Sequence, residues 1–242
     1  MTDHNRLIRR LETIAPLKED DKAALHRLPL RTRSFDENRD LVSQGGKTTE
    51  CCVILEGFVA RYKMVSGGRR QIISLHFAGD FPDLQSLYLD RMDHGIYALT
   101  PVRAAFIPHE AIRALIRNND RINDILIRHA LIDAAIFRQW IANIGRRTAY
   151  ERIAHIFCEV YVRMQALGLA EEHSFHLPMT QAELGDATGL SPVHINRVLQ
   201  RMRKDGLVVS RGEVHSVVDW ERLRRAADFN DDYLHLRKLG PG

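Results

Sequence analysis

Residues 180–202 constrain the fold more than any other part of the chain, because they specify two short helices joined by a tight turn. Thr180 is followed three residues later by Glu183, which is the pattern of a reciprocal N-terminal cap, so a helix is predicted from Gln181. Gly189 has the backbone freedom that a tight turn requires. The first helix is therefore expected to end at this glycine.

A second helix is predicted directly after the turn. Ser191 is a favoured N-cap, and Pro192 occupies the first helical position, where its missing N–H breaks no hydrogen bond. The small Gly185 allows the two helices to cross closely. The side chains expected to be buried recur at helical spacing: Leu184, Ile195, Val198 or Leu199, and Met202. This arrangement predicts a helix-turn-helix, with a generic helical hairpin as the alternative.

The exposed face of the second helix, predicted over residues 192–204, favours the first of these interpretations. Val193, Arg197, Gln200 and Lys204 cluster opposite the buried side, flanked by His194, Arg201 and Asn196. Surface helices usually mix charges of both signs, whereas the stretch 197–211 holds five basic residues and one acid. Arginine can donate to both O6 and N7 of guanine, while basic side chains at the edges contact phosphates. This face is typical of a helix that enters the DNA major groove.

The residues that follow predict a small wing. Gly206 is expected to end the helix, and two strands are predicted around Arg211-Gly212. Asp219 is the N-cap of a last short helix. We therefore interpret residues 148–228 as a winged helix-turn-helix.

The N-terminal half has a different pattern. Residues 1–28 predict short helices, whereas residues 29–107 contain short β-branched and aromatic runs separated by turn signals at intervals of about 8–12 residues. That spacing is typical of an all-β sandwich or barrel.

A long helix is predicted between these two regions. Residues 120–143 contain no Gly or Pro, and one stripe of this segment is mainly isoleucine: Ile122, Ile125, His129, Ile132 and Ile136. The stripe suits packing against the chain's own β domain, and it also suits the seam of a two-stranded coiled coil. We expect a dimer interface on these five residues. Gly145 is expected to end the helix.

The overall prediction is an α+β chain. It has a β-roll sensor domain over residues 1–119, a central dimerisation helix over 120–145 and a winged helix-turn-helix domain over 146–242. The composition is that of a soluble globular protein, and the pI of about 9.1 permits a polyanionic partner without requiring one. The N-terminus lacks the pattern of a secretory signal, and no apolar run is long enough to span a membrane. Three sparse cysteines suit a reducing cytoplasm.

The order of these elements resembles the CRP/FNR superfamily of bacterial transcription regulators. The resemblance covers about residues 10–228. It is carried by the glycine-punctuated QGGKTTECCVILEGFVARYK, by the strand and Gly-Asp turn of GRRQIISLHFAGDF, and most specifically by TQAELGDATGLSPVHINRVLQRMRKDGLV.

The resemblance implies a homodimer that binds double-stranded DNA, with RNA polymerase as a further partner. By position, Arg197 matches the family's base-reading arginine, and Thr180, Ser191 and His194 match phosphate contacts. Val193 stands where the family often has a base-reading glutamate, so a different half-site is expected. The full set of expected DNA-binding residues is Thr180, Gln181, Ser191, Pro192, Val193, His194, Asn196, Arg197, Gln200, Arg201, Lys204 and Arg211.

The resemblance also bears on the effector. Members that bind cyclic AMP carry a Gly-Glu and an Arg-Ser after the Gly-Asp turn. Here Asp83 stands near the glutamate place, and His94-Gly95 occupies the Arg-Ser place, so a phosphate would lose its cationic partner. The cysteines of iron–sulfur members are missing as well. We expect no cofactor and an effector other than cyclic AMP, contacted by Asp83, Arg91, His94, Phe137 and Arg138.

Other patterns carry weaker functional hypotheses. His173 and His176 have metal-ligand spacing but no cysteine nearby, and Cys51-Cys52 allow a redox role. No catalytic constellation is found, so we expect no enzyme. A module that senses small molecules and uses its helix-turn-helix for protein contacts remains the alternative to a DNA-binding regulator.

Overall fold

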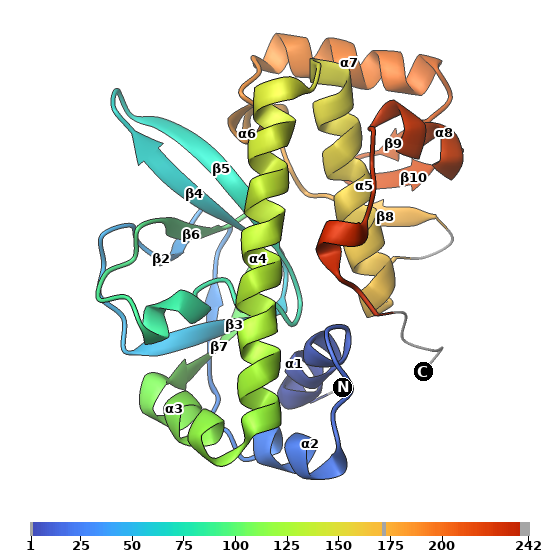
Figure 1. The fold of residues 1–242 in the computed structure, drawn as a ribbon. Coiled ribbons are helices and arrows are strands. Elements are labelled where there is room, and N and C mark those ends of the chain that lie inside the picture. The colour runs from blue at the N-terminus through green and yellow to red at the C-terminus, as the bar shows by residue number, and fades with distance from the viewer. Residues whose placement is uncertain (1, 171–172, 238–242) are drawn as a thin grey trace. The chain divides into compact units, whose positions relative to one another are not determined.

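The computed structural model describes residues 2–170 and 173–237. The chain divides into two compact units, and the first ends at Ala134 while the second begins at Ala135 (Figure 1). The division falls inside the long helix, at a different place from the predicted boundary near residue 145. Each unit is described by itself.

Two short helices open the first unit, as predicted. They are α1 (Asp3–Glu12) and α2 (Glu19–His26). These helices bury the side chains of Leu7, Leu11 and Leu25, so the apolar face of each helix contributes to the core of the first unit.

Two antiparallel sheets form the β-roll. One has the order β1 (Arg31–Phe35), β7 (Val102–Pro108), β3 (Glu50–Glu56). The other has the order β2 (Asp40–Val42), β6 (Gly95–Ala98), β4 (Val59–Val65), β5 (Arg69–His76). One core cluster joins the inner faces of both sheets: Val42, Cys52, Ile54, Val59, Met92, Ile96, Ala98, Val102, Ala104 and Phe106. The predicted all-β region is confirmed, with one short 3-10 helix, η1 (Leu84–Leu87), inserted.

Two further helices follow the roll. The first is α3 (His109–Asn118), and the second is the long α4 (Asp120–Arg146), which ends within one residue of the predicted glycine. Asn119 caps the start of α4, because its side-chain oxygen accepts a hydrogen bond from the Ile122 N–H at 2.9 Å.

The second unit contains the winged helix-turn-helix. Its elements are α5 (Ala149–Leu167), β8 (Ser174–His176), α6 (Gln181–Thr188), α7 (Pro192–Lys204), β9 (Val208–Arg211), β10 (Val214–Val217), α8 (Trp220–Ala226) and the 3-10 turn η2 (Asp232–Leu234). The strands form one antiparallel sheet in the order β8-β10-β9. The fold class is confirmed, and the segment Ser174–His176 pairs with β10 as a strand.

The isoleucine stripe of α4 corrects one prediction. Ile122, Ile125, His129, Ile132 and Ile136 are all less than 9% exposed, so they face the interior of the chain and are not available to a partner. Within the first unit, the His129 ring lies edge-on to Phe81 at 6.4 Å between centroids. The exposed large apolar residues of α4 are instead Ile127, Leu131 and Ile141.

Candidate nucleic-acid interface and sensor interior

The turn between α6 and α7 depends on two glycines. A Cβ at Gly185 would lie 2.5 Å from the Leu190 carbonyl oxygen, so only glycine allows this approach. Gly189 has a φ of +71°, in the left-handed region that favours glycine. The reciprocal cap of Thr180 and Glu183 is present, and the Ser191 hydroxyl accepts a hydrogen bond from the His194 N–H at 3.3 Å. The predicted helix-turn-helix is therefore built from the predicted residues.

The buried side of α7 is formed by Ile195, Val198 and Met202, as expected. Eleven of the twelve predicted DNA-binding residues are exposed, and Asn196 is half-buried. Val193 is 63% exposed, so its apolar side chain is open to an external contact. The recognition face is therefore free of packing contacts along most of its length.

Ion pairing on α7 is sparse. Arg201 lies 3.7 Å from Asp205, measured from Nε to a carboxylate oxygen. Within residues 2–170 and 173–237, Arg197 and Lys204 form no ion pair. Exposed cations without carboxylate partners are suited to phosphate and guanine acceptors.

A surface groove of about 660 Å³ runs along the first turns of α7 and contains residues that sequence reasoning missed. It is lined by Thr148, Ala149, Tyr150, Ser191, Val193, His194, Arg197, Val198 and Arg201. The Arg201 guanidinium lies 5.0 Å from the Tyr150 ring centroid, and the Tyr150 hydroxyl donates to Asp205 at 2.8 Å. The start of α5 therefore supports the recognition helix. The capping pattern of Thr148 and Glu151 is the sequence signal that marks this helix start.

The wing is formed as predicted. Arg211 is exposed at the tip, next to Gly212, whose φ is +61°. His215 on β10 is buried under the wing, and burial followed by the nearby Arg203 charge lowers its pKa to about 4. This histidine is therefore a neutral core residue.

A buried ion pair occupies the interior of the β-roll and was not predicted from the sequence. Arg61 on β4 is 1% exposed. Its guanidinium donates to the Pro82 carbonyl and to the Asp133 carboxylate on α4. Burial opposes ionisation of Asp133, but the Arg61 charge holds the pKa of this carboxyl below its ordinary value. The pair therefore joins the roll to the middle of α4.

Further buried polar groups surround this pair. Asp80 of the Gly-Asp turn accepts from Arg10 Nε at 2.6 Å and lies 3.5 Å from His76 Nδ1. Burial, followed by the Arg61 charge, lowers the pKa of His76 to about 4, and burial and the Arg10 charge lower that of His129 to about 4. Both histidines are therefore neutral near pH 7.

Asp83 is fully buried beside Cys52. One carboxylate oxygen accepts the Cys52 N–H at 2.8 Å, whereas the other has no hydrogen-bond partner. Burial raises the pKa of Asp83 to about 7, against the opposing effect of the Cys52 hydrogen bonds and of Arg61. A carboxyl in this position is poorly placed to accept further hydrogen bonds from a ligand at the surface.

The five predicted effector residues are divided between the two units. Asp83 and His94 are buried, while Arg91 is exposed and donates to the Gly45 carbonyl at 3.2 Å. Phe137 and Arg138 belong to the second unit. The His94-Gly95 pair has a packing role, because a Cβ at Gly95 would lie 2.4 Å from the Tyr62 ring. Neither of the two grooves described in this section is lined by Asp83, Arg91 or His94, and an effector contact of the five residues stays a prediction.

The cysteines and the paired histidines have structural environments. Cys51, Cys52 and Cys158 are buried, and burial raises the pKa of each thiol, which disfavours the reactive thiolate. His173 lies 3.0 Å from the Tyr161 hydroxyl, and His176 lies 2.9 Å from Glu213. Among the described residues, no cluster of three or more His, Cys, Asp or Glu side chains is arranged to hold a metal ion.

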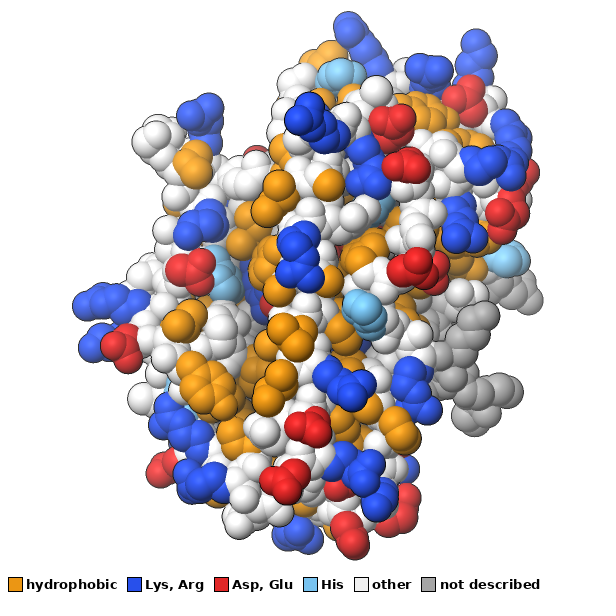
Figure 2. All heavy atoms as spheres, in the orientation of Figure 1, with side chains coloured by type: hydrophobic (Ala, Val, Ile, Leu, Met, Phe, Trp, Pro, Cys, Tyr) orange, Lys and Arg blue, Asp and Glu red, His pale blue; other side chains and the backbone are white. Residues whose placement is uncertain are grey.

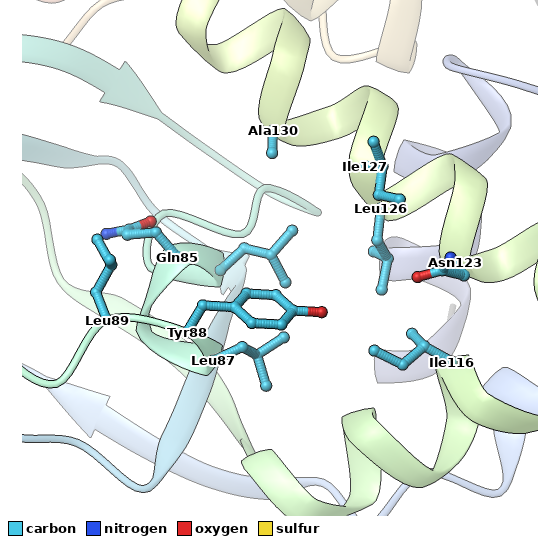
Figure 3. A pocket seen from close by; sticks show the side chains of 10 residues that line it. Gln85, Leu87, Tyr88, Leu89, Ile116, Asn123, Leu126, Ile127 and Ala130 are labelled. Atoms are coloured by element: carbon cyan, nitrogen blue, oxygen red, sulfur yellow. The ribbon is translucent and has the colours of Figure 1, made fainter.

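An apolar groove of about 310 Å³ lies between η1, α3 and α4 in the first unit (Figure 3). It is lined by Leu84, Gln85, Leu87, Tyr88, Leu89, Ile116, Asn123, Leu126, Ile127 and Ala130. Figure 3 shows the Tyr88 ring directed from the roll toward α4. None of the predicted effector residues lines this groove.

No described helix is both long enough and apolar enough to cross a bilayer.

Two domain families match this chain in sequence. Residues 32–119 match the cyclic nucleotide-binding domain, and residues 151–226 match the Crp-like helix-turn-helix domain. The two matches cover the roll and the helix-turn-helix described above, in the same order.

The similar proteins are transcriptional regulators. The transcriptional activator protein FnrL of Cereibacter sphaeroides is 25% identical over 207 residues, which cover 83% of this chain and 82% of that protein. The nitrogen fixation regulation protein FixK of Rhizobium meliloti is 26% identical over 185 residues, 76% of this chain and 80% of that protein. The structure of FixK2 from Bradyrhizobium japonicum has the same fold, with a TM-score of 0.75 at 21% identity, covering 82% of this chain and 98% of that one. The chain therefore combines a cyclic nucleotide-binding domain with a Crp-like helix-turn-helix domain, which is the arrangement of the CRP/FNR transcriptional regulators, and those regulators are not enzymes.

Proposed function

We propose that this protein is a homodimer that binds a near-palindromic DNA operator through α7 and acts in the cytoplasm with RNA polymerase as a partner. One observation carries the proposal. The outward face of α7 presents Arg197, Gln200 and Lys204, and neither cation forms an ion pair within the described residues. A helix that served only protein contacts would not need a basic face of this kind.

Each side chain on this face has a proposed role. Arg197 lies at the centre of the outward face and reads a base, whereas His194 and Arg201 flank it and contact phosphates. Val193 is exposed at the N-terminal end of α7, where an apolar side chain suits the methyl group of thymine. In a dimer, two such helices enter successive major grooves, with half-sites roughly 34 Å apart.

The dimer is proposed on the exposed face of α4, not on the predicted isoleucine stripe. Ile127, Leu131, Ala134, Arg138 and Ile141 follow one another at intervals of four and three residues. This is the a/d spacing of a coiled coil. The first and last isoleucines are 51% and 71% exposed, and Figure 2 shows hydrophobic side chains along the face of α4 toward the viewer. A partner helix on this face would also run past the apolar groove, since Ile127 and Ala130 line it.

The effector is proposed to be a molecule other than cyclic AMP, and no cofactor is required. A nucleotide phosphate inside the roll would need a cationic partner. Arg61, the buried cation of the roll interior, already bonds Asp133 and the Pro82 carbonyl. Titration calorimetry of the protein with cyclic AMP should give no binding heat at micromolar concentrations, and a saturable isotherm would refute this part of the proposal.

A salt-dependent gel shift tests the DNA-binding function. Fragments of host genomic DNA should be retarded by the wild-type protein, and the logarithm of the binding constant should fall linearly with the logarithm of the salt concentration. Arg201→Ala should lower that slope by about one unit for each phosphate that the variant no longer neutralises. Absence of a shift at low salt would favour the alternative function, in which the helix-turn-helix contacts a protein.

Sedimentation tests the dimer face separately. The double variant Ile127→Asp/Ile141→Asp should be monomeric at micromolar concentration, because it places four charges in the proposed seam of two helices. The matched control is Arg128→Asp, which changes the charge of an exposed α4 residue off the seam. If the wild type and the double variant sediment alike, the proposed face is wrong.

A further inference from the structure

The segment after α8 folds back onto the second unit, although it lies beyond the matched helix-turn-helix domain. We call residues 227–234 the tail. Ala227, Phe229 and Leu234 of the tail are buried, and Figure 1 shows this red segment running beside α5. Burial of three apolar side chains from a short irregular segment indicates a fixed position.

The start of the tail is attached to the joint between α4 and α5. Arg147, in that joint, donates from Nη2 to the Asp228 carbonyl oxygen at 3.0 Å. Phe229, the next residue of the tail, forms two hydrogen bonds with Arg224 of α8. Arg224 Nε donates to the Phe229 carbonyl oxygen at 3.1 Å, and the Arg224 carbonyl oxygen accepts the Phe229 N–H at 3.0 Å. The chain direction at the joint is therefore coupled to the tail.

The end of the tail contacts a buried carboxylate between two helices. Glu159 on α5 is 1% exposed. It accepts hydrogen bonds from the Trp140 indole of α4 at 3.2 Å and from the Tyr233 hydroxyl of the tail at 2.7 Å. Arg163 lies 3.5 Å from the same carboxylate. One acceptor thus joins the last turns of α4, the middle of α5 and the tail.

Aromatic rings also pack between α5 and the tail. The His155 ring of α5 stacks on Tyr233 with 5.9 Å between centroids and meets Phe229 edge-on at 5.2 Å. His155 Nε2 also lies 3.1 Å from the Gln139 side-chain amide of α4. The tail therefore packs against the same helix residues that contact α4.

We propose that the tail is a strap that fixes the angle between α4 and α5, and thereby the separation of the two recognition helices in a dimer. The second half of this inference rests on the proposed dimeric DNA binding. Tyr233 is a positioning residue in this account, because it acts through Glu159 and Trp140 and does not touch DNA.

Hydrogen exchange on the full-length protein without DNA tests the strap directly. Tyr233→Phe removes one hydrogen bond to a buried carboxylate, so amide exchange in residues 136–146 should accelerate about tenfold. Tyr161→Phe is the matched control, because its hydroxyl contacts His173 instead of the tail. A second pair of variants ends the chain after Ala226 or after Arg237, and only the shorter chain should show the faster exchange. Exchange within about twofold of wild type in both tail variants would overturn the strap.

Operator spacing supplies the readout that a merely structural role would not change. Duplexes with half-site separations altered by one or two base pairs should bind the wild type about tenfold more weakly than the optimal duplex does. For Tyr233→Phe, the affinities for the altered and the optimal duplexes should differ by less than about threefold, and the affinity for the optimal duplex should be unchanged. Unchanged discrimination together with faster exchange would overturn the link to DNA. A wild type that ignores spacing would count against dimeric operator binding, and the exchange measurement would then decide the strap alone.

Discussion

The interior of the β-roll and the outward face of α7 use the same residue types in opposite ways. In the roll, Arg61 is buried and bonded to Asp133. On α7, Arg197 is exposed, and within the described residues it has no ion-pair partner. A buried cation needs an acceptor within the chain, because an unpaired buried charge is strongly unfavourable. An exposed cation is free for an external acceptor. Arg197 and Lys204 of the proposed recognition face differ from the buried arginine of the roll in having no ion-pair partner among the described residues.

The largest expected effect comes from breaking the buried pair. Arg61→Ala leaves Asp133 without its cation and should lower the free energy of unfolding by about 3–5 kcal/mol. Replacing both partners, as Arg61→Met/Asp133→Leu, should recover much of that stability, because no uncompensated charge remains. The control is Arg201→Ala on α7, whose exposed pair with Asp205 should contribute at most about 1 kcal/mol. Differential scanning calorimetry measures the loss of stability in each variant. Equal destabilisation by Arg61→Ala and Arg201→Ala would contradict the proposed difference between the buried and the exposed arginine.

The next effect is acid destabilisation of the roll. The pKa values of His76 and His129 are lowered from 6.5 to about 4 in the folded state, mainly by burial. The folded protein therefore binds fewer protons than the unfolded chain between these values. The stability that each histidine contributes is present above pH 6.5 and is lost as the pH falls toward 4, by up to about 3 kcal/mol each. Unfolding curves from pH 7 to 4 should show this fall, and His129→Asn should reduce its slope.

A smaller effect of opposite sign is expected from Asp83. Burial raises the pKa of this carboxyl from 3.8 to about 7, so the folded state favours the protonated form. Its contribution to stability is present below pH 3.8 and is lost as the pH rises through 7. Asp83→Asn keeps an acceptor for the Cys52 N–H and should stabilise the protein by about 1–2 kcal/mol at pH 8. The gain in stability should vanish near pH 4. A gain that does not depend on pH would show that ionisation of the buried Asp83 carboxyl is not its cause.

The smallest effect is expected at Val193 on α7. Val193→Ala should reduce DNA affinity by less than about 1 kcal/mol, because alanine no longer reaches the thymine methyl group. Val193→Glu should instead change the preferred half-site, since glutamate accepts from the cytosine amino group. Binding titrations on the duplex that the wild type prefers measure the affinity lost in Val193→Ala. An unaltered half-site preference in Val193→Glu would show that position 193 does not face the bases.

The helix-turn-helix could be predicted from the sequence because its signals are local. Thr180, Ser191 and Gly189 each act within a few residues of their own position, and all three have the predicted roles. The buried ion pair could not be predicted in this way. An arginine on a strand usually reaches solvent, and the carboxylate that pairs with the buried Arg61 belongs to Asp133, 72 residues further along the chain.

The face of α4 shows a different limit. A stripe of isoleucines predicts that one side of the helix is buried, but it does not say against what. In the structure that stripe faces the chain's interior, and the residues left for a partner include Leu131 and Ile141. Only the packing of the roll distinguishes these two sides.

Binding selection on randomised duplexes tests the central claim most directly. Wild type, Arg197→Ala and Arg203→Ala are compared at one salt concentration, and the last variant removes the same charge from a position nearer the buried side of α7. We expect the wild type to select a near-palindromic site and Arg203→Ala to select the same site. In Arg197→Ala, the preference at one base pair per half-site should be weakened by about 1–3 kcal/mol. If Arg197→Ala selects the wild-type half-site with the same discrimination, Arg197 does not read sequence and the proposed recognition face is contradicted.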